Sequence, residues 1–301
     1  MSESTGFVAP EGAALCLGVF DGVHKGHQAL IERCVSEASH RGLIPVVHSF
    51  EPHPAAFFRQ QTERYLLTLP DRRSELLRNL GIAHVVFASF DAQFAGQTPE
   101  QFLDHLVGHH GAQLVVTGPD YRFGRDRLGD VSLIHRDGRF DAVTLDEVGG
   151  LEMRYRSSSM RHALEHGDVS KLNQLTGRFF DFEGRVVRGQ GRGRELGFAT
   201  ANLAVDIRQL LPADGVYAVR VMTEQWVDDG VMNIGRAPTV RGVKGERIAE
   251  VHVFDFHGDL YGQDLRVELR HRIRGEQSFD GLESLKKQIT KDVETARRVL
   301  L

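Results

Sequence analysis

Residues 13–28 read Ala-Ala-Leu-Cys-Leu-Gly-Val-Phe-Asp-Gly-Val-His-Lys-Gly-His-Gln, and this stretch decides the fold of the N-terminal part of the chain. A short apolar run, which predicts a buried strand, passes into a glycine-rich turn and then into a segment with helical periodicity. Glycine lets the backbone approach a ligand, and a helix N-terminus offers free N–H groups with partial positive charge. The stretch therefore predicts a phosphate-binding site after a parallel strand, with Gly18, Phe20, Asp21, Gly22 and Gly26 in its turn.

The segments that follow alternate between short apolar runs and longer helical patterns. Strands are predicted near 13–19, 44–48, 83–87 and 113–117, and helices near 26–40, 71–79 and 98–108. The last of these helices has a start signal, because Thr98 can cap it and Gln101 occupies the capping-box position. Alternating strands and helices are typical of βαβ units, so we predict a doubly wound α/β domain with a parallel sheet.

The pattern changes after Gly177. Runs at 182–187, 215–221, 249–254 and 265–269 alternate in hydrophobicity between glycine-rich turns, which predicts an antiparallel sheet or small barrel. The chain then closes with a helix for which Asp280 and Glu283 fit a cap. We predict two domains, residues 1–177 and 178–301, the second an antiparallel β-barrel with a closing α-helix.

Composition limits the class of protein. The 301 residues, 41% hydrophobic and 26% charged, suit two globular domains, and the net charge of −4 argues against a nucleic-acid or membrane-surface footprint. Cys16 and Cys34 form no CxxC pair, so we expect them to be buried thiols in a reducing compartment. No apolar run suits a signal peptide or a spanning helix, and a cytoplasmic location is expected.

His24 and His27 lie three residues apart in the first turn, as His-x-Gly-His. Two imidazoles at that place could stabilise charge on a pentacoordinate phosphorus, either as neutral rings or as imidazolium ions. A lone histidine usually has a structural role, whereas the strand, the glycines and the helix start favour function here. In this context the motif resembles that of the nucleotidyltransferase superfamily, whose members transfer a nucleotidyl group and release pyrophosphate.

Further landmarks narrow the resemblance. Residues 49–54 (Ser-Phe-Glu-Pro-His-Pro) and 118–124 (Gly-Pro-Asp-Tyr-Arg-Phe-Gly) follow the second and fourth strands. Turn chemistry would explain each of them alone. Together they resemble the N-terminal module of bacterial bifunctional riboflavin kinase/FAD synthetases, which makes the following residues candidates for the flavin and nucleotide crevice: Pro52, His53, Asp120, Arg122 and Phe123.

Residues 156–161 read Arg-Ser-Ser-Ser-Met-Arg and are similar to a helix-opening Ser-Ser-Thr-x-x-Arg segment of that family. The resemblance implies that Ser157, Ser158 and Arg161 hold the ATP triphosphate. Arg156 replaces the first serine and Ser158 the threonine, so hydroxyl and guanidinium chemistry are retained.

A second site is predicted at 189–202, which read Gly-Gln-Gly-Arg-Gly-Arg-Glu-Leu-Gly-Phe-Ala-Thr-Ala-Asn. Interleaved glycines and arginines can cradle phosphates, although a hairpin loop explains them equally well. Thr200 and Asn202, two positions apart on an extended segment, point to one side and suit a Mg²⁺ ion that bridges ATP phosphates. The predicted ATP-binding set is Gly191, Gly193, Arg194, Gly197, Thr200 and Asn202.

This segment resembles the riboflavin kinase signature, with Ala199 in place of a proline, and the similarity continues in family order to Glu276. The resemblance implies that Glu250 is the base that takes the proton from the riboflavin 5′-hydroxyl. Alone, Glu250 would be interpreted as a solvent-facing residue of an alternating strand.

We therefore predict a bifunctional enzyme. The C-terminal domain would convert riboflavin and Mg-ATP to FMN and ADP, and the N-terminal domain would convert FMN and ATP to FAD and pyrophosphate. At Ala199, Arg156 and Pro119 the sequence departs from the family pattern, which leaves open an enzyme with only one active site or with a modified flavin as substrate. A second alternative is a non-catalytic sensor of flavin or nucleotide. The expected partners are the small molecules riboflavin, FMN and ATP, without nucleic acid or membrane, and the oligomeric state is left open.

Overall fold

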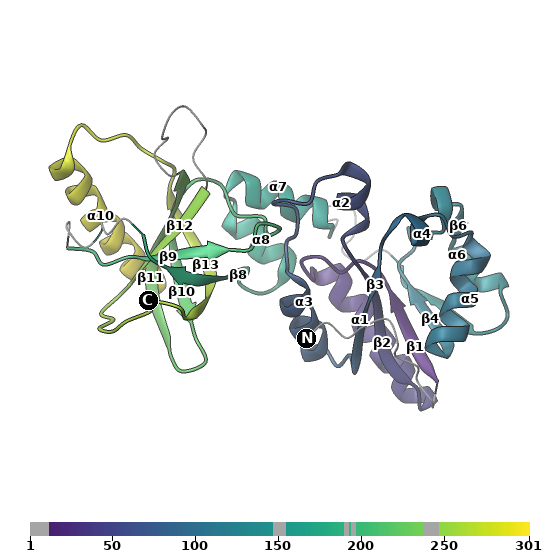
Figure 1. The fold of residues 1–301 in the computed structure, drawn as a ribbon. Coiled ribbons are helices and arrows are strands. Elements are labelled where there is room, and N and C mark those ends of the chain that lie inside the picture. The colour runs from purple at the N-terminus through teal and green to yellow at the C-terminus, as the bar shows by residue number, and fades with distance from the viewer. Residues whose placement is uncertain (1–11, 147–154, 190–192, 194–196, 237–246) are drawn as a thin grey trace. The chain divides into compact units, whose positions relative to one another are not determined.

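The computed structural model describes residues 12–146, 155–189, 193, 197–236 and 247–301. The chain divides into two compact units, Met1–Ser159 and Met160–Leu301 (Figure 1).

The first unit is an α/β layer structure. Its sheet has the order β3-β2-β1-β4-β7, and every pairing in it is parallel. The elements in chain order are β1 (Ala13–Leu17), α1 (Lys25–Arg41), β2 (Ile44–Glu51), α2 (Pro54–Arg59), α3 (Pro70–Asn79), β3 (His84–Ser89), α4 (Ala92–Ala95), α5 (Pro99–His110), β4 (Ala112–Thr117), β5 (Arg122–Phe123), a 3₁₀ turn (Arg125–Arg127), β6 (Gly129–Asp130), α6 (Val131–Arg136) and β7 (Asp141–Thr144).

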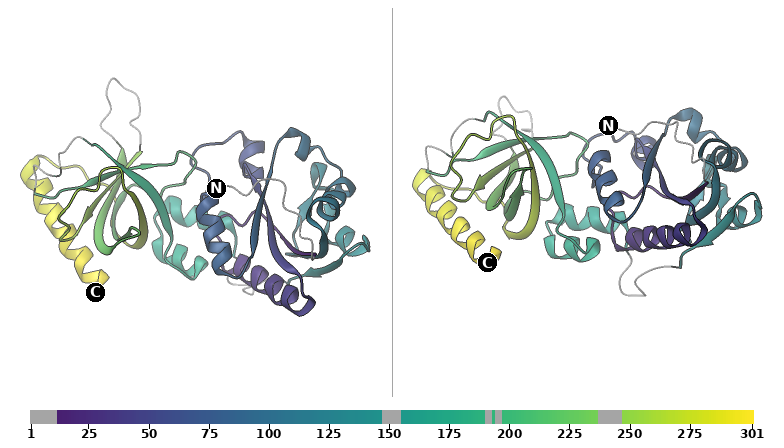
Figure 2. Two further views of the ribbon diagram at one scale, coloured as in Figure 1. Left: turned by 60° about the horizontal axis from the view of Figure 1, so that its bottom comes forward. Right: turned by 90° about the horizontal axis from the view of Figure 1, so that it is seen from below.

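Helices cover both faces of this sheet. Apolar residues of α1 and α3 pack on one face, and residues of α5 and α6 pack on the other (Figures 1 and 2). Because both faces are covered, all five residues of β1 are buried, as in a central parallel strand. This confirms the doubly wound α/β domain predicted from the sequence.

The start signal predicted for the helix at 98–108 is confirmed by a complete capping box. Thr98 accepts from the backbone N–H of Gln101 at 3.2 Å, and the Gln101 side chain accepts from the backbone N–H of Thr98 at 2.9 Å. Helix α1 ends at Gly42, whose φ of 68° is a left-handed conformation that glycine adopts without strain.

The second unit contains a closed six-stranded barrel with the order β10-β11-β12-β9-β8-β13. All of its strand pairs are antiparallel. Its elements are α7 (Ser157–His166, shared with the first unit), α8 (Val169–Thr176), β8 (Asp181–Val187), β9 (Ala201–Val205), β10 (Gly215–Met222), β11 (Val227–Arg236), β12 (Arg247–Val253), β13 (Asp264–Arg274) and α10 (Leu282–Leu300). The predicted barrel with a closing helix is confirmed.

The side chains of strand β10 distinguish the outer face of the barrel from its interior. Val216 and Ala218 pack against Ala296 of α10, so they lie on the outer face that this helix covers (Figure 2). Tyr217 and Val219, which alternate with them, are fully buried and therefore face the barrel interior. The barrel interior is thus filled by side chains.

Helix α10 begins differently from the expectation. Its N-cap is Gly281, which makes no side-chain capping bond, so the prediction that Asp280 caps the helix is wrong. Arg274 of β13 instead anchors the helix by donating to the buried carboxylate of Asp292 at 2.8–3.1 Å.

Helices α7 and α8 fold with the barrel from Met160 onward. Asn173 of α8 donates to the Leu269 carbonyl of β13 at 3.2 Å, and Arg272 donates to the His166 carbonyl of α7 at 2.8 Å. The boundary between the compact units therefore falls between Ser159 and Met160, earlier in the chain than the predicted domain boundary at 177. That the two catalytic domains divide at residue 177 stays a prediction.

Both cysteines are buried free thiols, as expected. Within the part of the chain that the structure describes, no helix is both long enough and apolar enough to cross a membrane.

Candidate functional site

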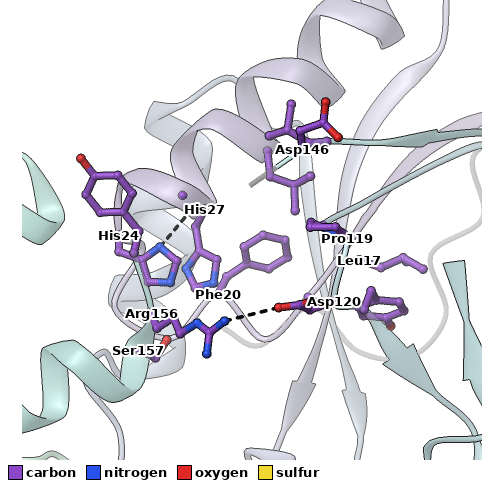
Figure 3. Close-up of a pocket in the computed structure, with 16 residues that line it drawn as sticks. Leu17, Phe20, His24, His27, Pro119, Asp120, Asp146, Arg156 and Ser157 are labelled. Atoms are coloured by element: carbon purple, nitrogen blue, oxygen red, sulfur yellow. Dashed lines mark hydrogen bonds and ion pairs between the residues drawn. The ribbon is translucent and has the colours of Figure 1, made fainter. Parts of the chain in front are cut away.

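A pocket of about 330 Å³ opens where β1 and β4 end (Figure 3). The turn after β1, the loop after β4 and the start of α7 supply its walls. The residues that line it are Leu17, Gly18, Phe20, His24, Gly26, His27, Leu30, Gly118, Pro119, Asp120, Tyr121, Leu145, Asp146, Tyr155, Arg156 and Ser157. A pocket at the carboxyl ends of parallel strands is where open α/β sheets bind ligands.

The two histidines of the predicted motif both line this pocket. Their rings stack with centroids 3.6 Å apart and planes inclined by 16°, and His27 also meets the ring of Phe20 edge-on at 5.1 Å (Figure 3). Gly26 lies between them, and a Cβ there would come within 3.3 Å of the His24 ring and 3.2 Å of Tyr155. Glycine at position 26 therefore leaves room for this close packing.

Hydrogen bonding fixes the tautomer of His24. Its Nδ1 accepts from the His27 backbone N–H at 3.1 Å, which caps α1 and leaves Nε2 as the protonated nitrogen of the neutral ring. Burial lowers the pKa of His24 to about 4. Burial, with the charges of His24 and Arg73, lowers the pKa of His27 well below its ordinary value. Of the two states that the sequence left open, the structure therefore favours neutral rings.

The turn between β1 and α1 holds an unusual backbone. Phe20 and Val23 have φ values of 56° and 43°, a region that non-glycine residues rarely adopt. The buried Asp21 carboxylate accepts from the backbone N–H groups of Leu67 and Thr68 at 2.9–3.1 Å. The structure thus shows an anchoring role for Asp21, which does not line the pocket, and its predicted contact with the nucleotide stays a prediction.

Gly22 also belongs to this anchor. Its N–H donates to the Thr68 hydroxyl at 3.0 Å, and it does not line the pocket, unlike Gly18, Phe20 and Gly26. The residue supports the turn rather than the pocket wall.

The start of α7 is tied to the same turn. The Ser157 hydroxyl donates to the Asp21 carbonyl at 2.8 Å, which places Ser157 at the pocket. Arg156, where the related family has serine, forms an ion pair with Asp120 across the pocket at 3.5 Å (Figure 3). Ser158 and Arg161 lie further along α7 and are outside the pocket lining.

The residues predicted for the flavin and nucleotide crevice lie in different environments. Asp120 lines the pocket, whereas the exposed Arg122 pairs with Asp130 at 3.2 Å. Phe123 is buried in the core beneath α5, with its ring centroid 5.2 Å from that of Phe102, and it does not line the pocket. Its predicted place in the flavin crevice stays a prediction.

His53 and Pro52 follow β2. The His53 Nδ1 accepts from the Ala55 N–H at 3.0 Å and caps α2, and neither His53 nor the exposed Pro52 lines the pocket. For His53 the structure shows a helix cap, and its predicted contact with flavin stays a prediction.

Arg73 of α3 is a structural residue of this site that the sequence reasoning missed. Its side chain is fully buried and donates to the carbonyls of Val19 at 2.9 Å and Thr68 at 3.4 Å. A Glu51 oxygen lies 3.8 Å away. Arg73 therefore joins the turns after β1 and β2 to the loop before α3. An arginine in a polar helical run gives no sequence signal for this role.

The second predicted site lies on the outer wall of the barrel. Strand register places Asn202 opposite Glu250, Glu250 opposite Asn233, and Asn233 opposite Val216. Residues opposite one another on paired strands share a face, and Val216 lies on the outer face, so the three polar side chains form one outward row. A Cβ at Gly235 would lie 2.8 Å from the Glu276 carboxylate and 3.5 Å from the Asn233 amide, which adds Glu276 to this row. Asn233 and Glu276 were quoted from the sequence without a role.

Two glycines lie directly over the proposed metal ligands. A Cβ at Gly189 would come within 2.1 Å of the Asn202 amide, and one at Gly193 within 2.8 Å of the Thr200 hydroxyl. Only glycine leaves space there, so these two glycines let the backbone pass close to the side-chain oxygens of Thr200 and Asn202, the kind of donor that Mg²⁺ prefers. Gly197 is exposed with a φ of 88°, and Gly191 and Arg194 lie outside the described residues.

His252 secures the segment that carries Thr200. Its Nδ1 donates to the Ala199 carbonyl at 2.7 Å, and its ring meets that of Phe198 edge-on at 5.7 Å. His252 is two residues beyond Glu250 on β12, so one strand positions both the segment and the carboxylate.

Together, the pocket and the fold define a nucleotide-binding α/β enzyme that carries a second, barrel-shaped unit. Family models described as FAD synthetase and riboflavin kinase match residues 7–160 and 176–300. The chain belongs to the family of bifunctional riboflavin kinases/FMN adenylyltransferases.

Individual relatives agree with this assignment. Bifunctional riboflavin kinase/FMN adenylyltransferases of Escherichia coli K12 and Bacillus subtilis 168 are 38% and 33% identical, over 95% of this chain and 92% of each relative. A crystal structure described as a macrolide-efflux protein from Streptococcus pneumoniae matches with a TM-score of 0.86 and 30% identity, over 96% of this chain and 94% of that one.

The two activities follow from the family. The C-terminal part is a riboflavin kinase domain and the N-terminal part an FAD synthetase domain, so the chain is a bifunctional enzyme of FMN and FAD synthesis that uses ATP.

Proposed function

We propose that each activity resides in one of the two sites described above and that both sites are active. The stacked His24 and His27 at the pocket carry the assignment of adenylyl transfer, and the row of Asn202 and Glu250 on the barrel wall carries that of riboflavin phosphorylation.

In adenylyl transfer, a phosphate oxygen of FMN attacks the α-phosphorus of ATP, and the bond to pyrophosphate breaks. Charge then develops on the α-phosphate oxygens, and N–H donors held at that place stabilise it. The His24 Nε2–H is free of the capping bond made by Nδ1. The His27 ring lines the same pocket and is kept neutral by burial. Both rings can therefore serve the phosphate without gaining a proton first.

The helix that starts at Ser157 supplies the triphosphate contacts in this proposal. Its N–H groups and hydroxyls suit phosphate oxygens, and Arg161, four residues after Ser157 and thus on the same helix face, adds a guanidinium. Arg156 replaces a hydroxyl by a positive charge beside the pocket, which favours a polyphosphate ligand.

In riboflavin phosphorylation, the 5′-hydroxyl oxygen attacks the γ-phosphorus of ATP and ADP leaves. Glu250, held outward on β12, accepts the hydroxyl proton. Thr200 and Asn202 would hold Mg²⁺, which neutralises phosphate charge when it is bound. His252 keeps the Thr200 segment against the strand of Glu250 through the Ala199 carbonyl.

A time course of products, measured by mass spectrometry, tests the proposal and separates it from its alternatives. The wild-type enzyme with riboflavin and Mg-ATP should form FMN first and FAD later. His27→Ala should stop at FMN, with FAD formation about 10²–10³ times slower. Glu250→Gln should form FMN about 10²–10⁴ times more slowly yet convert supplied FMN to FAD at the normal rate.

His40→Ala, which removes an exposed histidine of α1, is the matched control and should change neither rate. FMN alone from wild type would show a single active site, and no product would indicate a sensor. Equal loss of both activities in a folded single variant would overturn the separation of the sites.

The proposed location of the protein is the cytoplasm, because its two cysteines are free thiols and its activities use ATP. The partners in this proposal are riboflavin, FMN and ATP.

A further inference from the structure

Three histidines meet inside the first unit, on the side of the sheet that α5 covers. His48 lies on β2, and His105 and His110 lie on the last two turns of α5. One ring nitrogen of each lies within 4.8 Å of the others. None of the three lines the pocket, so the cluster is separate from the proposed adenylyltransferase site.

His48 is the unusual member. Its side chain has no exposed surface, and neither ring nitrogen has a hydrogen-bond partner. The rings of Phe50 and Phe102 meet it edge-on at 5.3 and 5.9 Å and offer no acceptor or donor for it. A neutral imidazole carries one donor and one acceptor, and a buried polar group normally finds a partner. The packing of His48 therefore calls for a ligand to a ring nitrogen.

We propose that His48, His105 and His110 bind one divalent transition-metal ion of the zinc type, which fastens the end of α5 to β2. Imidazole nitrogen is a donor that Zn²⁺, Co²⁺, Ni²⁺ and Cu²⁺ prefer, whereas Mg²⁺ and Ca²⁺ prefer oxygen. Three protein ligands leave a fourth tetrahedral position for water. The site is thus chemically distinct from the Mg²⁺ site proposed at Thr200 and Asn202.

The geometry needs only a small adjustment. Ligand nitrogens around a tetrahedral zinc ion lie about 3.3 Å apart, given Zn–N bonds of about 2.0–2.1 Å. The present separations reach 4.8 Å, and the half-buried His105 can close the difference by rotating its ring. His105 also provides the path by which an ion reaches the buried His48.

The protonation state suits this role. Burial and the neighbouring histidines lower the pKa of His48 well below its ordinary value, and they lower that of His105 to about 4. Both rings are neutral at physiological pH, and a neutral imidazole is the form that ligates a metal.

Cobalt titration of the chelator-stripped full-length protein tests the proposal. Wild type should bind one Co²⁺ with the strong visible absorption of a tetrahedral site, and Zn²⁺ should displace it. His105→Gln should weaken the affinity for Co²⁺ at least about tenfold, because removing a residue that only hydrogen-bonds to a metal ligand already lowers metal affinity about tenfold or more. The ring of His109 stacks on that of His105 at 4.4 Å and could replace it, so His48→Phe is the second variant. Phenylalanine keeps an aromatic ring in the apolar surroundings.

Two controls remove histidines elsewhere. His40→Gln deletes an exposed residue of α1. His162→Gln breaks the other helical pair, in which the exposed His162 and His166 have ring centroids 4.1 Å apart. Both controls should keep the absorption. The proposal would be overturned if wild type lacked the tetrahedral absorption, or if both site variants kept it at full affinity. It would also be overturned if a control variant lost the absorption to the same extent as the site variants.

Discussion

Replacing His24 by asparagine should make the first unit less sensitive to acid. His24 is buried and neutral in the folded protein, with a pKa of about 4 against an ordinary value of 6.5. Between these two values the unfolded chain binds a proton that the folded chain does not, so the stability falls as the pH falls. For these two pKa values, linkage predicts a loss of about 2 kcal/mol in the free energy of unfolding between pH 7 and pH 5.

Asparagine is the matched replacement for this test. His24 is the N-cap of α1 and its Nδ1 accepts from the N–H of His27, the third residue of the helix. The asparagine side-chain oxygen makes the same capping bond and does not titrate. His24→Asn should thus retain the cap while losing about 2 kcal/mol less than wild type on acidification, because burial, the main cause of the lowered His27 pKa, acts in both proteins.

The measurement must report on the first unit alone. The single tryptophan, Trp226, lies in the second unit, so its fluorescence does not serve. Hydrogen exchange of the fully buried β1, followed by mass spectrometry at pH 7, 6 and 5 in chelating buffer, gives the free energy of opening of the parallel sheet. Equal losses in wild type and His24→Asn would show that His24 is not held neutral by burial.

Three further changes have defined outcomes. Arg73→Met should destabilise the first unit by about 2–4 kcal/mol in the same exchange assay, because the buried carbonyls of Val19 and Thr68 lose their donors. A loss below about 1 kcal/mol would contradict this. Thr98→Ala should cost about 1 kcal/mol and speed exchange in the first turn of α5, and unchanged exchange there would contradict the capping box. Ala199→Pro should change the KM for Mg-ATP in riboflavin phosphorylation only a fewfold, since His252 already holds the Ala199 carbonyl and the added restriction is worth about 0.4–1 kcal/mol; an inactive wild-type kinase rescued by this proline would refute the expectation.

Strong local patterns made most of the fold predictable. Strands β1 to β4 and β10 carry continuous or alternating apolar residues, and α5 carries a full capping box, so they were found within a few residues of their ends. Strand β11 was missed because Asp228, Asp229, Gly230 and Asn233 weaken its apolar pattern. Pairing on both sides, with β10 and β12, holds it in the barrel in spite of its sequence.

The candidate sites were predictable where motif and position coincide. His24, His27 and Asp120 reach one pocket because they follow parallel strands whose carboxyl ends share an edge. Asp21 and Phe123 belong to the same motifs but do not line the pocket. The Asp21 carboxylate accepts from backbone N–H groups, and the Phe123 ring packs in the hydrophobic core. Arg73 and the histidine cluster depend on contacts between distant segments, which spacing along the chain does not reveal.

Asn202, Glu250 and Asn233 lie on the outer face of the barrel wall, and this has a consequence for how the enzyme can change. The barrel interior is filled, so Asn202, Glu250 and Asn233 contribute little to its packing. Replacing them leaves no internal cavity, and large losses of stability come mainly from such cavities or from buried unpaired groups. Substitutions in this row can therefore abolish the proposed kinase chemistry while the barrel keeps its melting temperature.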